Sequence, residues 1–302
     1  MPKKKSKIKP KKEIHKSNRF FLFLFLAFLL IVAVSFRKTI QNEIKAIIET
    51  PRSETKKIPP EVSRNLDPRY SPKYKVPILL YHYVEYVTDE KDTIRKSLNI
   101  EPDIFEAQVK TLKENGYTFM TASELAQVLN GNSRLPRKPV LLTFDDGHWD
   151  VETVILPILK KYNARATAYV APALLNGSDF MTKKQMEKII DSGLIEIGAH
   201  TVHHISLQGK ISPIVMYEVT QSKKILENEY GIRVLSFAYP NGDFDQQAID
   251  IIKDAGYLTA VTTVPGILQS KQNQYFLLRL RPGQRIGKDL TDYFNQTEFK
   301  PY

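Results

Sequence analysis

The 302-residue sequence contains no cysteine. This absence excludes a disulfide framework and a metal site built from thiolates. It is compatible with an exposed surface protein of bacterial type, although it does not require one.

The sequence also has little excess charge outside one short segment. The net charge is +11, and residues 1–19 supply +8 of it through nine Lys or Arg residues and one Glu. Only +3 is left for the remaining 283 residues. A nucleic-acid-binding domain needs a basic folded surface, so we expect no nucleic-acid partner.

Residues 20–36 lack any charged side chain. These seventeen residues reach the short end of the length that spans a bilayer as a helix, and they have no polar face of the kind a core helix keeps. The basic residues before them predict a cytoplasmic N-terminus. We therefore expect a basic cytoplasmic tail over 1–19, an uncleaved transmembrane signal-anchor over 20–36 and an extracellular remainder in a single-pass protein of the cell membrane. Cleavage after the small residues Ala33 and Ser35 is the alternative.

Residues 37–74 are rich in Lys, Glu, Arg and Pro and show no sustained apolar period, which predicts a stalk. From residue 75 to 302, short apolar runs alternate with helical patterns, as in repeated βα units. The seven runs are Val76 to Tyr81, Val140 to Phe144, Ala166 to Ala171, Leu194 to Ala199, Val234 to Ala238, Leu258 to Thr263 and Tyr275 to Arg281. They predict an α/β fold, either a parallel barrel or a doubly wound sheet.

Helix starts are readable between these runs. Thr121 with Glu124 and Thr182 with Gln185 fit capping boxes, and Ser212 before Pro213 predicts an N-cap followed by proline at the first helical position.

Polar residues follow four of the runs. In both candidate architectures the functional face lies at the carboxyl ends of the strands. Five of the six histidines of the chain fall at such ends, together with an acid pair. The residues are His82 and Tyr83, then Asp145, Asp146 and His148, then His200, His203 and His204, and finally Tyr239 to Gly242. Their convergence predicts a chemical site and is hard to attribute to packing.

This set of side chains suits a divalent metal ion. His200 pairs by spacing with either His204 or His203, and two imidazoles with one carboxylate leave positions open, as in catalytic zinc sites. One acid of the Asp145–Asp146 pair can then bind the ion while the other takes a proton from water. The same ligands occur in non-haem Fe(II) oxygenases, so they do not fix the metal. A plain Asp-Asp-Gly turn is the structural alternative.

Two motifs, TFDDG (143–147) and HTVHH (200–204), together resemble the polysaccharide deacetylases of carbohydrate esterase family 4, the NodB-homology domain. The similarity covers most of residues 76–282 and includes PILLYHYV, FEAQVKTLKENGY, PILKKY and FAYPNG. It implies that residues 75–302 form a distorted (β/α)7 barrel. The implied activity removes N-acetyl groups from glucosamine-containing polysaccharides with a divalent metal ion, for which zinc is the first choice.

The resemblance also assigns residues. It implies that Asp145 is the general base and that Asp146, His200 and His204 bind the metal. It further implies that a backbone N–H at Asn241 or its neighbour helps to hold the oxyanion, a role that needs only a positioned amide.

The chain departs from the family pattern at two places. Ala238 stands where many members have Arg, and the Leu-x-His motif that carries a general acid in peptidoglycan deacetylases is absent from YFLLRLRPG. The pattern is closer to the poly-β-1,6-N-acetylglucosamine deacetylase branch, in which an Arg occupies the last strand. Arg279 matches that Arg and is expected either to orient Asp145 or to be a plain surface charge.

His82 is the candidate for a substrate contact or a proton donor, with packing beneath the site as the alternative. His148 and His203 are candidates for contacts to the site residues.

The function expected from these features is metal-dependent N-deacetylation of an N-acetylated polysaccharide at the cell surface, with poly-N-acetylglucosamine favoured. Peptidoglycan or an acetylated xylan-like polymer is the alternative substrate. An alternative from a different functional class is a carbohydrate-binding protein without catalytic activity. Such a protein does not need a base beside a metal site, so the intact Asp145, Asp146, His200 and His204 weigh against it.

Overall fold

The structure is a computed structural model that describes residues 57–64, 74–89 and 91–296. The predicted tail and signal-anchor lie outside the described residues. Among the helices that are described, none is long and apolar enough to cross a bilayer.

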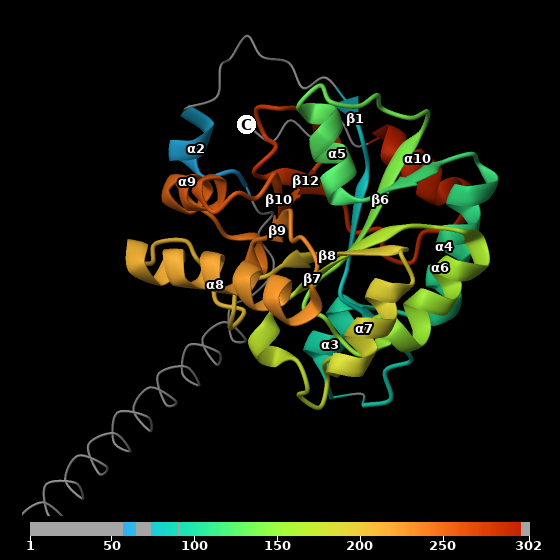
Figure 1. The fold of residues 1–302 in the computed structure, drawn as a ribbon. Helices are drawn as coiled ribbons and strands as arrows, with labels where there is room; N and C mark the ends of the chain where they lie inside the picture. The colour runs from blue at the N-terminus through green and yellow to red at the C-terminus, as the bar shows by residue number, and fades with distance from the viewer. Residues whose placement is uncertain (1–56, 65–73, 90, 297–302) are drawn as a thin grey trace, which may run out of the picture. The chain divides into compact units, whose positions relative to one another are not determined.

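The elements follow one another along the chain in a βα pattern (Figure 1). The helices are α2 (Pro60–Arg64), α3 (Thr93–Leu98), α4 (Pro102–Glu114), α5 (Ala122–Leu129), α6 (Leu156–Tyr162), α7 (Lys183–Asp191), α8 (Ser212–Tyr230), α9 (Gln246–Asp254) and α10 (Gly287–Gln296). The strands are β1 (Tyr74–Lys75), β2 (Ile78–Tyr81), β3 (Tyr83–Val84), β4 (Asn99–Ile100), β5 (Thr118–Met120), β6 (Pro139–Phe144), β7 (Ala166–Val170), β8 (Ile195–Ala199), β9 (Ser236–Ala238), β10 (Thr259–Pro265), β11 (Leu268–Gln269) and β12 (Leu277–Arg279). Three single turns of helix complete them: η1 (Val151–Ile155), η2 (Pro172–Leu174) and η3 (Pro240–Gly242).

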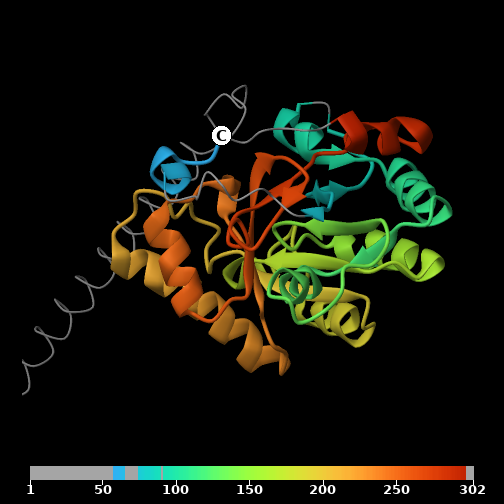
Figure 2. The ribbon, with the colours of Figure 1, turned by 90° about the horizontal axis from the view of Figure 1, so that it is seen from above.

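Seven parallel strands form a nearly closed barrel in the order β2-β6-β7-β8-β9-β10-β12. The ends of this series meet, because Leu79 of β2 pairs with Leu280, directly after β12. The amide of Leu80 donates to the Leu280 carbonyl at 2.9 Å, and the Leu280 amide donates to Ile78 at 2.8 Å. Figure 2 shows the helices around the outside of these strands.

The barrel confirms the prediction of a (β/α) barrel, and its seven strands lie within or overlap the seven predicted runs. It is distorted at two seams. Strands β8 and β9 pair at a single position, Ala199 with Phe237. Strands β10 and β12 shift register between Val261 and Pro265. Strand β5, which pairs with the start of β6, was not predicted because three residues carry no readable period.

Alternate residues of the strands supply two cores. Ile78, Leu141, Tyr169, Ala238 and Val261 belong to one buried cluster, which α5 joins through Leu125 and Val128. The outward residues of the same strands, such as Leu142, Phe144 and Ile197, pack in a second cluster with the surrounding helices. Both faces of every barrel strand are therefore buried, which is why the runs read as continuous apolar stretches.

Helix α5 is fixed at the amino ends of two strands. The Ala122 amide donates to the Thr167 hydroxyl of β7 at 3.0 Å, and Ser123 donates to Glu196 of β8 from its amide and its hydroxyl. The opposite end of the barrel, where the carboxyl ends of the strands lie, carries the polar residues that follow the strands.

The predicted capping boxes are both present, at Thr121 with Glu124 and at Thr182 with Gln185. The predicted cap at Ser212 is wrong by one residue. Ile211 occupies the cap position without a side-chain hydrogen bond, and Ser212 is already helical, because Pro213 is accepted in the second helical position as well as the first.

Candidate active site

The predicted site residues come from five strand ends. Asp145 and Asp146 follow β6, His82 follows β2, His200 follows β8, and Asn241 lies in η3 after β9. Arg279 is the last residue of β12. Because parallel strands end at the same rim of a barrel, chain segments up to about 200 residues apart contribute to one site.

Arg279 and Asp145 form a buried ion pair across the barrel. Nη1 of Arg279 donates to Oδ1 of Asp145 and Nη2 donates to Oδ2, each at 2.7 Å. The Arg279 Nε donates to the Thr262 carbonyl at 2.8 Å, and Nη1 also reaches the Thr143 hydroxyl at 3.2 Å. Arg279 is 1% exposed and Asp145 is 2% exposed, so the alternative of a surface charge at Arg279 is wrong.

The ion pair keeps Asp145 ionised. Burial by itself raises the pKa of the Asp145 carboxyl, but the charge and hydrogen bonds of Arg279 outweigh burial and hold that pKa below its usual value. Asp145 is therefore an anion at neutral pH, as a base must be before it accepts a proton.

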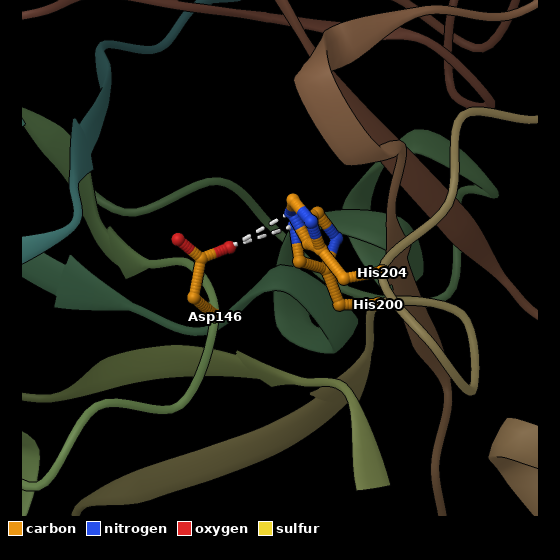
Figure 3. Close-up of side chains that lie close together, drawn as sticks. All are labelled: Asp146, His200 and His204. Atoms are coloured by element: carbon orange, nitrogen blue, oxygen red, sulfur yellow. Dashed lines mark ion pairs between the residues drawn. The ribbon is translucent and has the colours of Figure 1, made fainter. Parts of the chain in front are cut away.

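Asp146, next in the chain, faces a different set of groups (Figure 3). Its Oδ1 lies 3.3 Å from Nε2 of His200 and 3.0 Å from Nε2 of His204. The donor atoms of these three side chains all lie within 4.8 Å of one another. His203 is not part of this group, so the geometry selects His204 as the partner of His200.

This donor group fits a divalent ion. The Nδ1 of His200 lies 2.7 Å from the Ala238 carbonyl, to which it must donate. In the neutral form of the ring, the lone pair therefore lies on Nε2, which faces Asp146. Oδ1 of Asp146 is buried and has no hydrogen-bond partner in the described residues. A buried oxygen without a donor is costly unless a cation satisfies it. Two ligands of a tetrahedral zinc ion lie about 3.3 Å apart, which matches these separations.

His148 approaches the other oxygen of Asp146. Its Nε2 lies 3.4 Å from Oδ2 of Asp146, and its Nδ1 lies 3.1 Å from the Asp179 carbonyl. The ring is held between Tyr83, at a centroid distance of 4.0 Å, and Phe180, at 5.0 Å. His148 thus contacts the donor group from outside it, in agreement with the prediction that it touches a site residue.

Backbone strain is concentrated around the site. Seven non-glycine residues of the described chain have positive φ, and four of them are site residues or their neighbours: Asp146 (76°), Thr201 (61°), His204 (58°) and Asn241 (59°). A left-handed conformation is unfavourable for such residues, and it persists only where the surroundings enforce it. The donor group is therefore set by the backbone as well as by side-chain rotamers.

The loop that carries Asn241 is fixed on β10. The Thr263 hydroxyl donates to the Asn241 carbonyl at 3.0 Å, and the Thr262 hydroxyl donates to the Gly242 carbonyl at 2.7 Å. A Cβ at Gly242 would lie 2.1 Å from Oγ1 of Thr263, so the close approach requires glycine. The oxyanion role of the Asn241 amide stays a prediction.

His82 is buried near both acids. Burial lowers its pKa to about 3, although the charges of Asp146 and Asp145 act in the opposite direction. Its imidazole is therefore neutral at physiological pH, and this favours a substrate contact or packing over proton donation from an imidazolium. Nδ1 of His82 has no hydrogen-bond partner in the described residues.

One residue near the site was not predicted. Glu218 of α8 is 4% exposed and accepts hydrogen bonds from the loop that carries His200 and His204. Its signal in the sequence was an acid within the apolar face formed by Val215, Val219 and Leu226.

The fold and the site together define a class of protein: a hydrolase of the (β/α) barrel type, with a buried acid beside a histidine and carboxylate donor group. Comparison with known proteins narrows this class.

A family model described as polysaccharide deacetylase matches residues 132–260. YxkH of Bacillus subtilis (strain 168), assigned as a polysaccharide deacetylase, is 32% identical over 207 residues, which cover 68% of this chain and 71% of YxkH. The poly-beta-1,6-N-acetyl-D-glucosamine N-deacetylase of Staphylococcus aureus (strain MSSA476) is 24% identical over 214 residues, covering 67% and 73% of the two chains. The structure of the Streptococcus pyogenes deacetylase PplD in complex with acetate superposes with a TM-score of 0.68 at 30% identity, covering 75% of this chain and 99% of PplD.

The chain belongs to the polysaccharide deacetylase family, whose members are hydrolases that act on the amide bonds of polysaccharides.

Replacement of Arg279 by Met is expected to lower the free energy of unfolding by about 3–5 kcal/mol, because it leaves the Asp145 carboxylate buried without a partner. The double variant Asp145→Asn/Arg279→Met, which removes both charges, should be less destabilised than the single Arg279→Met variant. Denaturant unfolding of the wild type, both single variants and the double variant measures this coupling. Additive losses would show that the two side chains do not stabilise each other.

A second prediction concerns pH. The pKa of His82 is about 3 in the folded chain and 6.5 as the reference value, so between these pH values the unfolded state binds more protons. Stability then rises with pH over this window and is lost as pH falls through it, by up to about 3 kcal/mol at pH 4. Unfolding of wild type and His82→Gln at pH 7 and pH 4, with chelator present, should show a smaller acid loss in the variant. If the variant loses as much stability at pH 4 as the wild type, a group other than His82 causes the acid sensitivity.

Proposed function

We propose that this protein is a metal-dependent N-deacetylase of an N-acetylglucosamine-containing polysaccharide and that it acts at the cell surface. The observation that carries the proposal is the pairing of an ionised, oriented Asp145 with the adjacent donor group of Asp146, His200 and His204. A carbohydrate-binding protein would gain nothing from a buried carboxylate held beside such a group.

Asp146, His200 and His204 would hold the divalent ion. When bound, such an ion polarises a carbonyl oxygen and lowers the pKa of water, and zinc is the first choice for this mixture of imidazole and carboxylate donors.

Asp145 is proposed to take a proton from the water that attacks the acetamido carbonyl carbon. Each carboxylate oxygen has two lone pairs, so the bidentate bonds from Arg279 leave one on each oxygen for the proton. Arg279 thereby fixes the direction of the base without blocking it, and it is proposed as a positioning residue.

The reaction ends when the carbon–nitrogen bond breaks, acetate leaves and the amine takes up a proton. Protonated Asp145 has a lowered pKa and releases its proton readily, so it can return it to the amine. The neutral His82 is then proposed to contact the substrate. The amide at Asn241 is proposed to donate to the oxyanion of the tetrahedral intermediate.

The favoured substrate is poly-N-acetylglucosamine. Support comes from Arg279 in the last barrel strand, which matches the pattern of that branch, and from the similarity to the Staphylococcus aureus enzyme. The charge-free segment 20–36 and the basic residues before it support an anchor that holds residues 75–302 outside the membrane.

Replacement of Asp145 by Asn is expected to lower acetate release by about 10²–10⁴-fold, because the amide cannot accept the proton from water. Acetate is measured after incubation of the wild type and the variant with poly-N-acetylglucosamine and, in parallel, with peptidoglycan. Faster release from poly-N-acetylglucosamine supports the favoured substrate, whereas faster release from peptidoglycan assigns the alternative. An Asp145→Asn variant with undiminished activity refutes the proposed base, and a wild type inactive on both polymers refutes the proposed substrate class.

Removal of the metal is expected to abolish acetate release. The full-length chain is treated with a chelator, dialysed and assayed before and after addition of Zn²⁺, Co²⁺, Mn²⁺ or Mg²⁺. Activity should return when a transition metal is added. The His204→Ala variant should regain little activity, because it lacks one of the three proposed ligands. Full activity of the metal-free protein would contradict the proposal.

A further inference from the structure

Glu218 lies in α8, away from the strand ends, yet it contacts the loop between β8 and α8 that carries two of the three proposed metal ligands. Oε2 of Glu218 accepts hydrogen bonds from the backbone amides of Val202 at 2.7 Å and His203 at 3.0 Å. Oε1 lies 2.7 Å from Nδ1 of His203. Both oxygens of this buried carboxylate are therefore engaged by two consecutive residues of one loop.

A carboxylate on the buried face of a helix is costly unless its charge is compensated by hydrogen bonds. A leucine at this position would continue the apolar face of α8 at no such cost. The three bonds, which are of the charge-assisted kind, satisfy the carboxylate of Glu218 and at the same time fix the loop.

The two bonded amides lie between two strained residues. Thr201 precedes them with a φ of 61°, and His204 follows them with a φ of 58°. Neither residue is a glycine, which could adopt this left-handed conformation without strain. Bonds to Val202 and His203 hold the peptide groups between these residues and so oppose relaxation of the loop.

We propose that Glu218 is a positioning residue that holds the backbone of Val202 and His203, so that His204 faces the same ion as His200. The inference rests on the proposed metal site. Glu218 acts through the main chain, since the imidazole to which it bonds, that of His203, does not belong to the donor group. This distinguishes it from a carboxylate that orients a ligand by bonding to the ligand's own ring.

The test is the affinity of the metal-free, full-length chain for Zn²⁺, measured by competition with a chromophoric chelator. Glu218→Leu keeps the apolar packing of the buried helix face but has no acceptor oxygen, so it loses both amide bonds and the bond to His203. It is expected to bind Zn²⁺ about 10- to 100-fold more weakly than the wild type.

Two controls separate positioning from general damage. Glu196 of β8 also accepts three hydrogen bonds, from the Ser123 amide, the Ser123 hydroxyl and the Ser236 hydroxyl, but these fix α5 and β9 rather than the histidine loop. Glu196→Leu, which likewise removes all acceptor oxygens, should therefore leave Zn²⁺ affinity unchanged. His203→Ala removes the imidazole bond and keeps both amide bonds, so it should weaken affinity less than Glu218→Leu does.

Wild-type affinity in Glu218→Leu would overturn the inference while leaving the metal site in place. Equal losses in Glu218→Leu and His203→Ala would overturn the role of the main chain. A wild-type chain that binds no Zn²⁺ would overturn the metal site itself. Should Glu218→Leu fail to fold, hydrogen exchange in the wild type decides. Amides of Val202 and His203 that exchange as fast as an unprotected loop refute the inference, and strand-like protection supports it.

Discussion

The bidentate ion pair between Asp145 and Arg279 is the interaction on which the rest of the site depends. Two charges without access to water cost several kcal/mol unless their hydrogen bonds are satisfied. Here Arg279 bonds to both oxygens of Asp145, to the Thr262 carbonyl and to the Thr143 hydroxyl. The pair thus joins β6, β10 and β12 inside the barrel, near the seam where β12 meets β2. The same bonds that join these strands determine the direction in which the base points.

Asp145 and Asp146 are adjacent in sequence but are not equivalent in the structure. Asp145 ends an extended strand and points at Arg279, whereas Asp146 has a φ of 76° and points at His200 and His204. Gly147 follows with a φ of 80°, which glycine adopts without strain. The turn that the sequence suggests is therefore real, and its purpose is to separate two carboxylates that would otherwise repel each other. Burial raises the pKa of both carboxyls, and at Asp145 the Arg279 guanidinium outweighs burial.

Much of the barrel and most of the donor group could be predicted from the sequence, for a physical reason. Each parallel strand is buried on both faces and so appears as an apolar run, and the residue after the run falls at the functional rim. His200 and Asp146 are of this kind. Spacing alone left the choice between His203 and His204 open, and only the family resemblance selected His204. The choice depends on two left-handed residues, Thr201 and His204, whose conformation has no signature in the sequence. The sequence also left open whether Arg279 is buried. A strand in which Arg alternates with Leu has the same pattern at a protein surface and in a barrel interior.

The two halves of the site are held by different means. Asp145 and Arg279 lie on strands and bond to each other directly, so their geometry follows from the barrel. His204 lies in a strained loop, and the bonds that oppose its relaxation come from outside the strands that present the donors. Glu218 of α8 accepts hydrogen bonds from the amides of Val202 and His203, and the Ala173 amide of η2 donates to the Val202 carbonyl at 3.0 Å. Contacts from a helix that is remote from the strand ends in sequence therefore hold the loop of the proposed metal-binding half of the site. For this reason, motifs at the strand ends do not reveal Glu218.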